Sequence, residues 1–160
     1  MRRFADAGVL VAVGHTDADW AQTTMAIDAG AVVATHLFNQ MRGIHHRHPG
    51  PIPALMADGR MHVELIADGV HVHPAVIAMV RQAVPADRIV LVTDAMSATG
   101  QPDGDYVLGD LAVRVTDGVV RLVDGGALAG STLTMDQAFA VTRELAEQGA
   151  MSTLDILGEF

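Results

Sequence analysis

Four short apolar runs alternate with helix-like segments up to residue 93, and this alternation limits the possible folds of the chain most strongly. The runs cover residues 9–13, 31–35, 61–67 and 88–93, and the helix-like segments cover about 16–29, 54–58 and 74–84. Strands separated by helices pair in parallel through right-handed crossovers. Continuous Val, Ile, Leu and Ala runs are typical of strands that are buried on both faces. The sequence therefore predicts an α/β fold built from four βα units.

The pattern changes after residue 94. Three short alternating segments occur around residues 106–108, 111–115 and 119–123, and Asp117-Gly118 between the last two is a strong signal for a type I′ hairpin. Ser131 is a suitable N-cap for a helix over about residues 132–148. One stripe of that helix would carry Met135, Ala138, Phe139, Thr142 and Leu145. These patterns predict a small antiparallel unit followed by a returning helix.

Composition excludes several classes of function. The formal net charge of −9 argues against a nucleic-acid or anionic-membrane surface, and no apolar run approaches the roughly 18 residues that span a bilayer. The chain has no cysteine, so a metal would need histidine and carboxylate ligands, and we expect a cytoplasmic location. One loop departs from this acidic background. It has no Asp or Glu between Asp28 and Asp58, it can accept an anion, and it contains Arg42, His45, His46, Arg47 and His48.

Three of the apolar runs are followed, at once or after one residue, by a side chain that can bind a metal or transfer a proton. His15 follows the first run, His36 the second and Asp94 the fourth. Parallel α/β folds build their sites at the carboxyl ends of their strands. Two neutral imidazoles can converge on one Zn²⁺ or Fe²⁺ ion, and a nearby carboxylate can take a proton from water and return it to a leaving group. A strand-end histidine is also often a loop-anchoring hydrogen-bond partner, and Asp94 could be a helix or loop cap.

Further polar residues follow these strand ends. Asn39, Arg47 and His71 are candidates for holding a substrate, because Arg47 can fork onto phosphate oxygens and His71 can donate to the same group. The alternative for Arg47 is a solvated loop cation. We expect the neighbouring His45, His46 and His48 to be exposed or to form a subunit contact rather than a metal site. Within the third run, Glu64 and His62 are interpreted as an inner-layer polar pair.

Six motifs in this order resemble the N-acetylglucosamine-6-phosphate deacetylases of the amidohydrolase superfamily, over roughly residues 9–140. The motifs are Gly14-His-Thr, Thr35-His-Leu-Phe-Asn, Arg47-His-Pro-Gly50, Ile66-Ala-Asp-Gly-Val-His71, Leu91-Val-Thr-Asp-Ala95 and Leu128-Ala-Gly-Ser-Thr-Leu-Thr-Met135. The resemblance implies a distorted TIM barrel with a small β-sandwich domain and a catalytic divalent metal. It also implies hydrolysis of the acetamide of N-acetylglucosamine 6-phosphate to glucosamine 6-phosphate and acetate.

The resemblance also implies a role for each matching residue. His15 and His36 resemble metal ligands, for zinc in the first place and for iron, cobalt or manganese as alternatives, and Asp94 resembles the general base and acid. Asn39 and His71 resemble substrate contacts. Arg47 resembles the arginine that reaches the phosphate across the interface of a homodimer, and Gln40 departs from the family's usual small residue in the sugar-phosphate pocket. The family's third metal ligand, a glutamate on an earlier strand, has no counterpart here.

The resemblance therefore predicts the C-terminal part of an enzyme. Residues 1–105 would form the second half of a (β/α)₈ TIM-like barrel, 106–125 part of the β-sandwich, 126–150 a returning barrel helix and 151–160 a truncated tail. Such a chain would be active only with the missing half. The alternatives are an amidohydrolase acting on a different N-acyl sugar or cyclic amide, and a non-catalytic truncated module that binds metal.

Overall fold

A four-stranded parallel sheet forms the larger part of the computed structural model, which describes residues 1–147. Its strands are β1 (Val11–Val13), β2 (Ala31–Ala34), β3 (His62–Leu65) and β4 (Ile89–Leu91), in the order β1-β2-β3-β4. The helix α1 (Arg2–Ala5) precedes the first strand, and the intervening elements are α2 (Trp20–Asp28), α3 (Ile52–Ala57), α4 (Pro74–Ala83) and the 3₁₀ turn η1 (Ala86–Arg88). The predicted α/β fold and the parallel pairing are confirmed.

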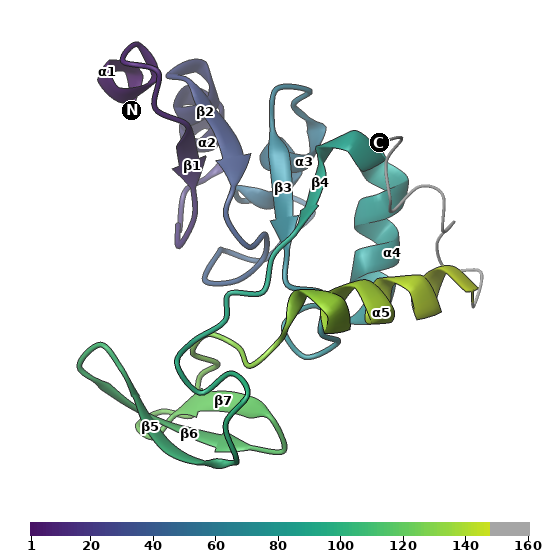
Figure 1. Cartoon of the computed structure of the whole chain (residues 1–160). Coiled ribbons are helices and arrows are strands. Elements are labelled where there is room, and N and C mark those ends of the chain that lie inside the picture. The colour runs from purple at the N-terminus through teal and green to yellow at the C-terminus, as the bar shows by residue number, and fades with distance from the viewer. Residues whose placement is uncertain (148–160) are drawn as a thin grey trace.

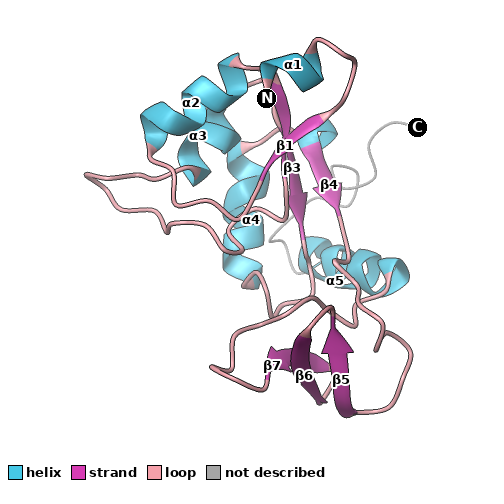
Figure 2. Cartoon of the chain, turned by 90° about the vertical axis from the view of Figure 1, so that its left-hand side faces the viewer, coloured by secondary structure: helices cyan, strands magenta, loops and turns pink. Residues whose placement is uncertain are grey.

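The helices α2, α3 and α4 cover one face of this sheet (Figures 1 and 2). Between them and the strands lies the main apolar core, whose fully buried members include Leu37, Ile52, Leu55, Met61, Val63, Leu65 and Val80. Burying each such side chain contributes about 1.5–3 kcal/mol. On the opposite face Ala12, His62 and Val90 are exposed. The expectation of burial on both faces is wrong for these positions, because the described helices α2–α4 cover one face only.

Arg88 ties the end of α3 to the start of β4. Its guanidinium donates hydrogen bonds to the carbonyl oxygens of Asp58 (2.7 Å), Met61 (3.0 Å) and Met56 (3.3 Å). Carbonyl groups at a helix C-terminus have no partner within the helix, so a cation that reaches several of them replaces water there.

The second sheet is antiparallel and small. Its strands are β5 (Gly104–Leu108), β6 (Leu111–Thr116) and β7 (Val119–Leu122), in the order β5-β6-β7. Asp117 and Gly118 both have positive φ, 51° and 74°, as a type I′ turn requires, so the predicted hairpin is confirmed. The carboxylate of Asp103 accepts hydrogen bonds from both of their N–H groups. A separate apolar cluster that includes Val113, Val115 and Val120 lies under this sheet.

The first long helix begins later than the sequence suggested. The predicted segment starts at residue 16, but Asp19 caps α2, through a capping box in which Asp19 and Gln22 each accept the other's backbone N–H. The buried positions of α2 are Thr23 and Ile27, whereas Met25 is 70% exposed.

The returning helix α5 (Met135–Glu147) also begins later than predicted. Ser131 does not cap it, because the helix begins four residues later, at Met135. The Ser131 hydroxyl donates to the carbonyl of Thr93 and accepts from the N–H of Leu133, and its own N–H donates to the carbonyl of Asp94. Of the predicted stripe, Ala138, Thr142 and Leu145 are buried, whereas Met135 and Phe139 are exposed. The tail expected over residues 151–160 lies outside the described residues, as do residues 148–150. No helix in the described part of the chain is long and apolar enough to cross a membrane.

Candidate active site

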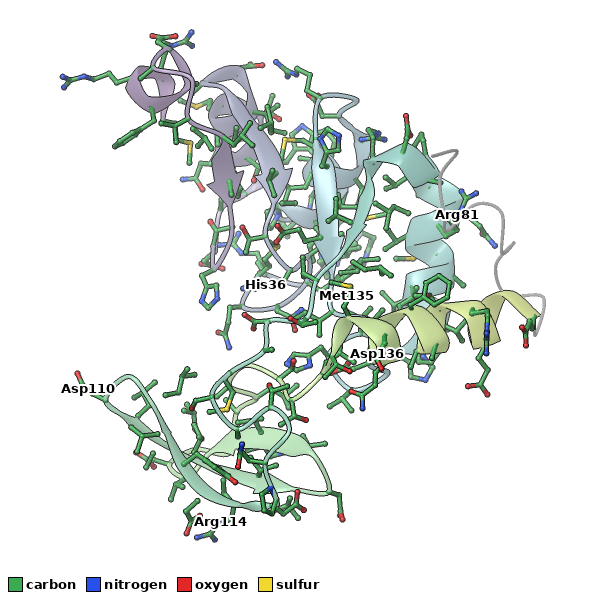
Figure 3. The ribbon with its side chains drawn as sticks, in the orientation of Figure 1. His36, Arg81, Asp110, Arg114, Met135 and Asp136 are labelled. Carbon is green, nitrogen blue, oxygen red and sulfur yellow. The ribbon has the colours of Figure 1, made fainter. Side chains whose placement is uncertain are left out.

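All four parallel strands point their carboxyl ends toward the small antiparallel sheet (Figure 1). His36 lies just beyond the end of β2, on the side that faces the small sheet (Figure 3). His15 follows β1 and Asp94 lies beyond β4. The topology therefore brings the three predicted residues to one edge of the sheet.

His15, His36 and Asp94 share an unusual backbone conformation. Their φ angles are 44°, 28° and 50°, in the left-handed region that favours glycine. His and Asp tolerate this region better than most residues do, but each such position still costs about 1–3 kcal/mol. Strained positions of this kind cluster at active sites and ligand clamps. The sharp turn at each strand end directs its side chain into the space between the two sheets.

The two histidine rings face each other. The Nε2 atoms of His15 and His36 are 3.1 Å apart, and the ring planes meet at 61°. At a Zn–N bond length of about 2.0–2.1 Å, two nitrogens separated by 3.1 Å subtend an angle of roughly 100° at a shared ion. The pair therefore fits one metal ion, although the same distance also suits a hydrogen bond between the rings. No group of three or more His, Asp or Glu side chains within residues 1–147 could hold a metal.

His36 is the more enclosed member of the pair. It is 8% exposed, and its Nδ1 is buried without a hydrogen-bond partner among the described residues. Its backbone N–H donates to Oε2 of Glu64 (3.2 Å), and Nδ2 of Asn39 donates to its carbonyl oxygen (3.1 Å). Glu64 thus supports the turn at His36 rather than pairing with His62. In the sequence, the only hint that Glu64 would bond a neighbouring turn is its position as a carboxylate within an otherwise largely apolar strand.

A cleft of about 620 Å³ opens between the two sheets at this point. Its polar lining includes His15, His36, Asn39, Gln40, His71 and Asp94. Its apolar lining includes Leu108, Leu111, Leu122 and Leu128 from the region of the small sheet. Six of the seven predicted site residues therefore line one cavity.

Arg47, the seventh predicted residue, is not among the residues that line this cleft. It lies exposed in the loop between β2 and α3, where its guanidinium is 2.7 Å from Nε2 of His46, and it lines a separate pocket with Trp20 and Arg42. Arg42 is engaged in a bidentate ion pair with Asp17, at 2.7 Å for both contacts. Within a single copy of the chain, Arg47 and the histidine pair belong to different cavities.

Asp94 is exposed at the cleft, and the returning chain fixes its backbone. Its carbonyl oxygen accepts a hydrogen bond from the N–H of Ser131 (2.8 Å), and Met96 N–H donates to Ser131 in turn (2.9 Å). Gly130 has φ +68°, and a Cβ there would lie 3.3 Å from the carbonyl oxygen of Asp94 and from Met96. Only a residue without a side chain fits this approach comfortably.

His71 has a carboxylate partner that the sequence reading missed. Its Nδ1 lies 2.6 Å from Oδ2 of Asp68, and the two side chains are only 6% and 14% exposed. Burial by itself raises the pKa of Asp68, but hydrogen bonds from the His71 ring, His71 N–H and Val70 N–H outweigh that effect and lower the pKa. The sequence does show an Asp three residues before a His in a loop, and this spacing could have indicated the contact between Asp68 and His71.

The fold and the cleft define an α/β protein with a polar site at the carboxyl ends of its parallel strands. No protein-family model matches the chain. It is 49% identical over 138 residues to the N-acetylgalactosamine-6-phosphate deacetylase of Escherichia coli O157:H7, covering 86% of this chain and 36% of that protein. It is also 49% identical over 134 residues to the N-acetylglucosamine-6-phosphate deacetylase of Vibrio furnissii, covering 83% and 33%.

Solved structures agree with these relatives. A mutant N-acetyl-D-glucosamine-6-phosphate deacetylase from Mycobacterium smegmatis, in complex with N-acetyl-D-glucosamine-6-phosphate, matches with a TM-score of 0.90 and 48% identity, over 95% of this chain and 41% of that one. The Thermotoga maritima N-acetylglucosamine-6-phosphate deacetylase matches with a TM-score of 0.85 and 36% identity, over 94% and 43%. The chain is thus a homologue of the N-acetylglucosamine-6-phosphate deacetylases. It spans about a third of the length of the curated relatives that it matches.

Proposed function

We propose that this chain supplies the catalytic side of a deacetylase site that hydrolyses the acetamide of N-acetylglucosamine 6-phosphate to glucosamine 6-phosphate and acetate. The observation that carries the proposal is the histidine pair, with its Nε2 atoms 3.1 Å apart, in one cleft with Asp94 and His71. The names of the relatives and the ligand of the Mycobacterium smegmatis complex support the same substrate class.

We also propose an assignment for the two sheets. The parallel βα part, predicted over residues 1–105, would correspond to the last four strands of a (β/α)₈ barrel, the segment predicted over 106–125 to part of a β-sandwich, and the returning helix, predicted over 126–150 and described as far as Glu147, to a barrel helix. Support comes from the unbroken order β1-β2-β3-β4 and from the match to about two fifths of a deacetylase chain at a TM-score of 0.90. A closed barrel of this kind needs roughly 250 residues.

His15 and His36 would hold a divalent metal ion. Zinc suits paired imidazoles best, and iron, cobalt and manganese are the alternatives. When bound, such an ion polarises a carbonyl oxygen and activates water for attack. Catalytic zinc sites have three protein ligands. Residues 1–147 contain no group of three such ligands. A third ligand, a glutamate by resemblance, would therefore come from outside these residues.

In this proposal Asp94 moves the proton. Its carboxylate takes a proton from the attacking water as oxygen adds to the acetamide carbon. It then delivers that proton to the nitrogen as the C–N bond breaks, releasing acetate and the free amine. Asn39, Gln40 and His71 line the same cleft, and in this proposal they would contact the sugar.

Arg47 would act in a different copy of the chain. Its exposure and its place in a separate pocket fit an arginine that reaches the phosphate of the neighbouring site in a homodimer. The homodimer and the cytoplasmic location stay predictions.

A chimera tests the proposed activity. Residues 9–140 would replace the matching segment of the Mycobacterium smegmatis enzyme, and acetate release would be measured with zinc and N-acetylglucosamine 6-phosphate. We expect turnover with the phosphorylated sugar and little with N-acetylglucosamine. The 4-epimer N-acetylgalactosamine 6-phosphate is the matched comparison, because a relative at 49% identity bears its name. A folded, zinc-loaded chimera without turnover on either phosphate would contradict the proposal.

A further inference from the structure

We propose that Asp68 is a positioning residue that holds the His71 ring with its proton on Nδ1 and its Nε2 free to face the cleft. The importance of this arrangement for catalysis rests on the proposed deacetylase function. The arrangement itself rests on the contacts of a single turn.

That turn runs from Asp68 to His71, immediately beyond β3. Oδ1 of Asp68 accepts hydrogen bonds from the N–H groups of Val70 (2.9 Å) and His71 (2.7 Å), while Oδ2 faces Nδ1 of His71 (2.6 Å). Gly69 supplies the positive φ, +75°, that the turn needs. One carboxylate therefore fixes both the backbone and the ring of the same histidine.

The carboxylate also determines which ring nitrogen is protonated. An ionised carboxylate only accepts hydrogen bonds, so the Nδ1 atom that faces it must carry the proton. Within the described residues Nε2 of His71 makes no hydrogen bond. The low exposure of both side chains, 6% and 14%, strengthens the contact, because it excludes most of the water that would compete for it.

The ring lies at the meeting point of two cavities. His71 lines the catalytic cleft and also a second cavity of about 340 Å³, and Asp68 lines this second cavity as well. A histidine ring in such a place has more than one rotamer open to it, and a hydrogen bond selects one of them. Asp68 supplies that hydrogen bond, in the way that carboxylates orient catalytic and metal-bound histidines.

The substitution Asp68→Asn makes a definite prediction about the proton. The asparagine oxygen would stay with the two backbone N–H groups, so its NH₂ group would take the place of Oδ2 and donate to Nδ1. The proton of His71 would then have to move to Nε2. The shape of the side chain is nearly unchanged, which separates this effect from a loss of packing.

Long-range ¹H–¹⁵N spectra of the ¹⁵N-histidine-labelled 160-residue chain report this directly. They would be recorded at about pH 9, where histidines are ordinarily neutral, and His71 would be assigned by loss of its signals in His71→Gln. We expect a protonated Nδ1 in the wild type and a protonated Nε2 in Asp68→Asn. Asp103→Asn is the matched control, since Asp103 also accepts two N–H groups of a turn but contacts no histidine.

An unprotonated Nδ1 of His71 in the wild type would overturn the proposal, whether or not the Asn variant folds. An unchanged tautomer in a folded Asp68→Asn variant would overturn it as well. Neither measurement depends on turnover. If the chimera shows no deacetylase activity, the assigned tautomer of His71 still holds. If the tautomer measurement contradicts the role of Asp68, the deacetylase activity is still decided by the acetate-release assay.

Discussion

His15 and His36 meet Nε2 to Nε2 at 3.1 Å, although they are 21 residues apart and follow two different strands. The contact forms because β1 and β2 pair in parallel and end at the same edge of the sheet. Both residues then leave their strands through left-handed backbone turns, so that their side chains converge. Strained backbone of this kind is typical of functional sites, so the two turns support a functional role for the pair.

Removing one ring of the pair should weaken zinc binding. We expect His36→Ala to lower the affinity of the chain for Zn²⁺ at least tenfold, since even the loss of an outer partner of a metal ligand costs about 10–100-fold. Isothermal titration calorimetry measures the change. His45→Ala, in an exposed loop, should leave the affinity unchanged. Equal affinity in the wild type and His36→Ala would argue against a shared ion.

Asp94→Asn should remove the proton carrier without removing the metal. In the chimera we expect turnover to fall by about 100 to 10,000-fold, with zinc content unchanged by atomic absorption. Asparagine tolerates the left-handed φ of 50° at this position, so the backbone should not move. Asp110→Asn is the control, because Asp110 lies exposed at the tip of the small sheet (Figure 3). Retained turnover would assign the proton transfer to another group.

Gly130→Ala should destabilise the fold more than Gly125→Ala. Both glycines have positive φ, +68° and +81°, so alanine costs about 1–2 kcal/mol of backbone strain at either position. Only at Gly130 would the new Cβ also press on Asp94 and Met96, which adds about 1 kcal/mol or more of overpacking. Urea unfolding of the two variants compares them. Equal losses would show that the close approach is easily relaxed.

Arg88→Met should be more costly than Arg60→Met. Arg88 holds three carbonyl groups from a partly buried position, and hydrogen bonds to charged groups contribute about 1.5–3 kcal/mol. Arg60 forms ion pairs with Asp28 and Asp58 at the surface, where such pairs contribute about 0.2–1 kcal/mol. Both free energies of unfolding can be measured in urea. The reverse ranking would mean that water replaces Arg88 without cost.

The pairing of Asp58 with Arg60 should appear in the acid limb of the stability curve. Side-chain and backbone hydrogen bonds from Arg60 lower the pKa of Asp58 from 3.8 to about 2. Because the folded-state pKa is depressed, the stabilisation is present above the unfolded-state pKa and is lost as the pH falls through the folded-state value. The difference between the wild type and Asp58→Asn, below about 1 kcal/mol at neutral pH, should shrink as the pH falls from 4 to 2 and vanish only below the folded-state pKa of about 2. A constant difference across this range would exclude the linkage.

Much of the fold could be predicted because its signals are local. Pro74 marks the start of α4, and Asp117-Gly118 marks the hairpin. Continuous apolar runs, each separated from the next by a helical segment, mark the parallel strands. The candidate site was predictable for the same reason. The carboxyl end of a parallel strand can be located from sequence, so His36 and Asp94 could be assigned to one edge of the sheet.

What could not be predicted depends on distant partners. Ser131 resembles an N-cap, and its hydroxyl does accept the N–H of Leu133, but it also donates to Thr93 on another segment, which no local pattern reveals, and α5 begins only at Met135. The role of Glu64 depends on the turn of a neighbouring strand, and that of Asp68 on the exact rotation of a ring. The exposed face of the parallel sheet was missed because a strand sequence does not record whether a second layer covers it.

Asp94 also lies where two segments that pass between the sheets meet. Within residues 1–147 the chain crosses from β4 to β5 and returns from β7 to α5, and the bridge between Ala95 and Ser131 joins these crossings beside Asp94. The backbone of Asp94 is therefore held by both crossings at once, so the placement of this carboxylate depends on the chain that returns from the small sheet as well as on the parallel sheet.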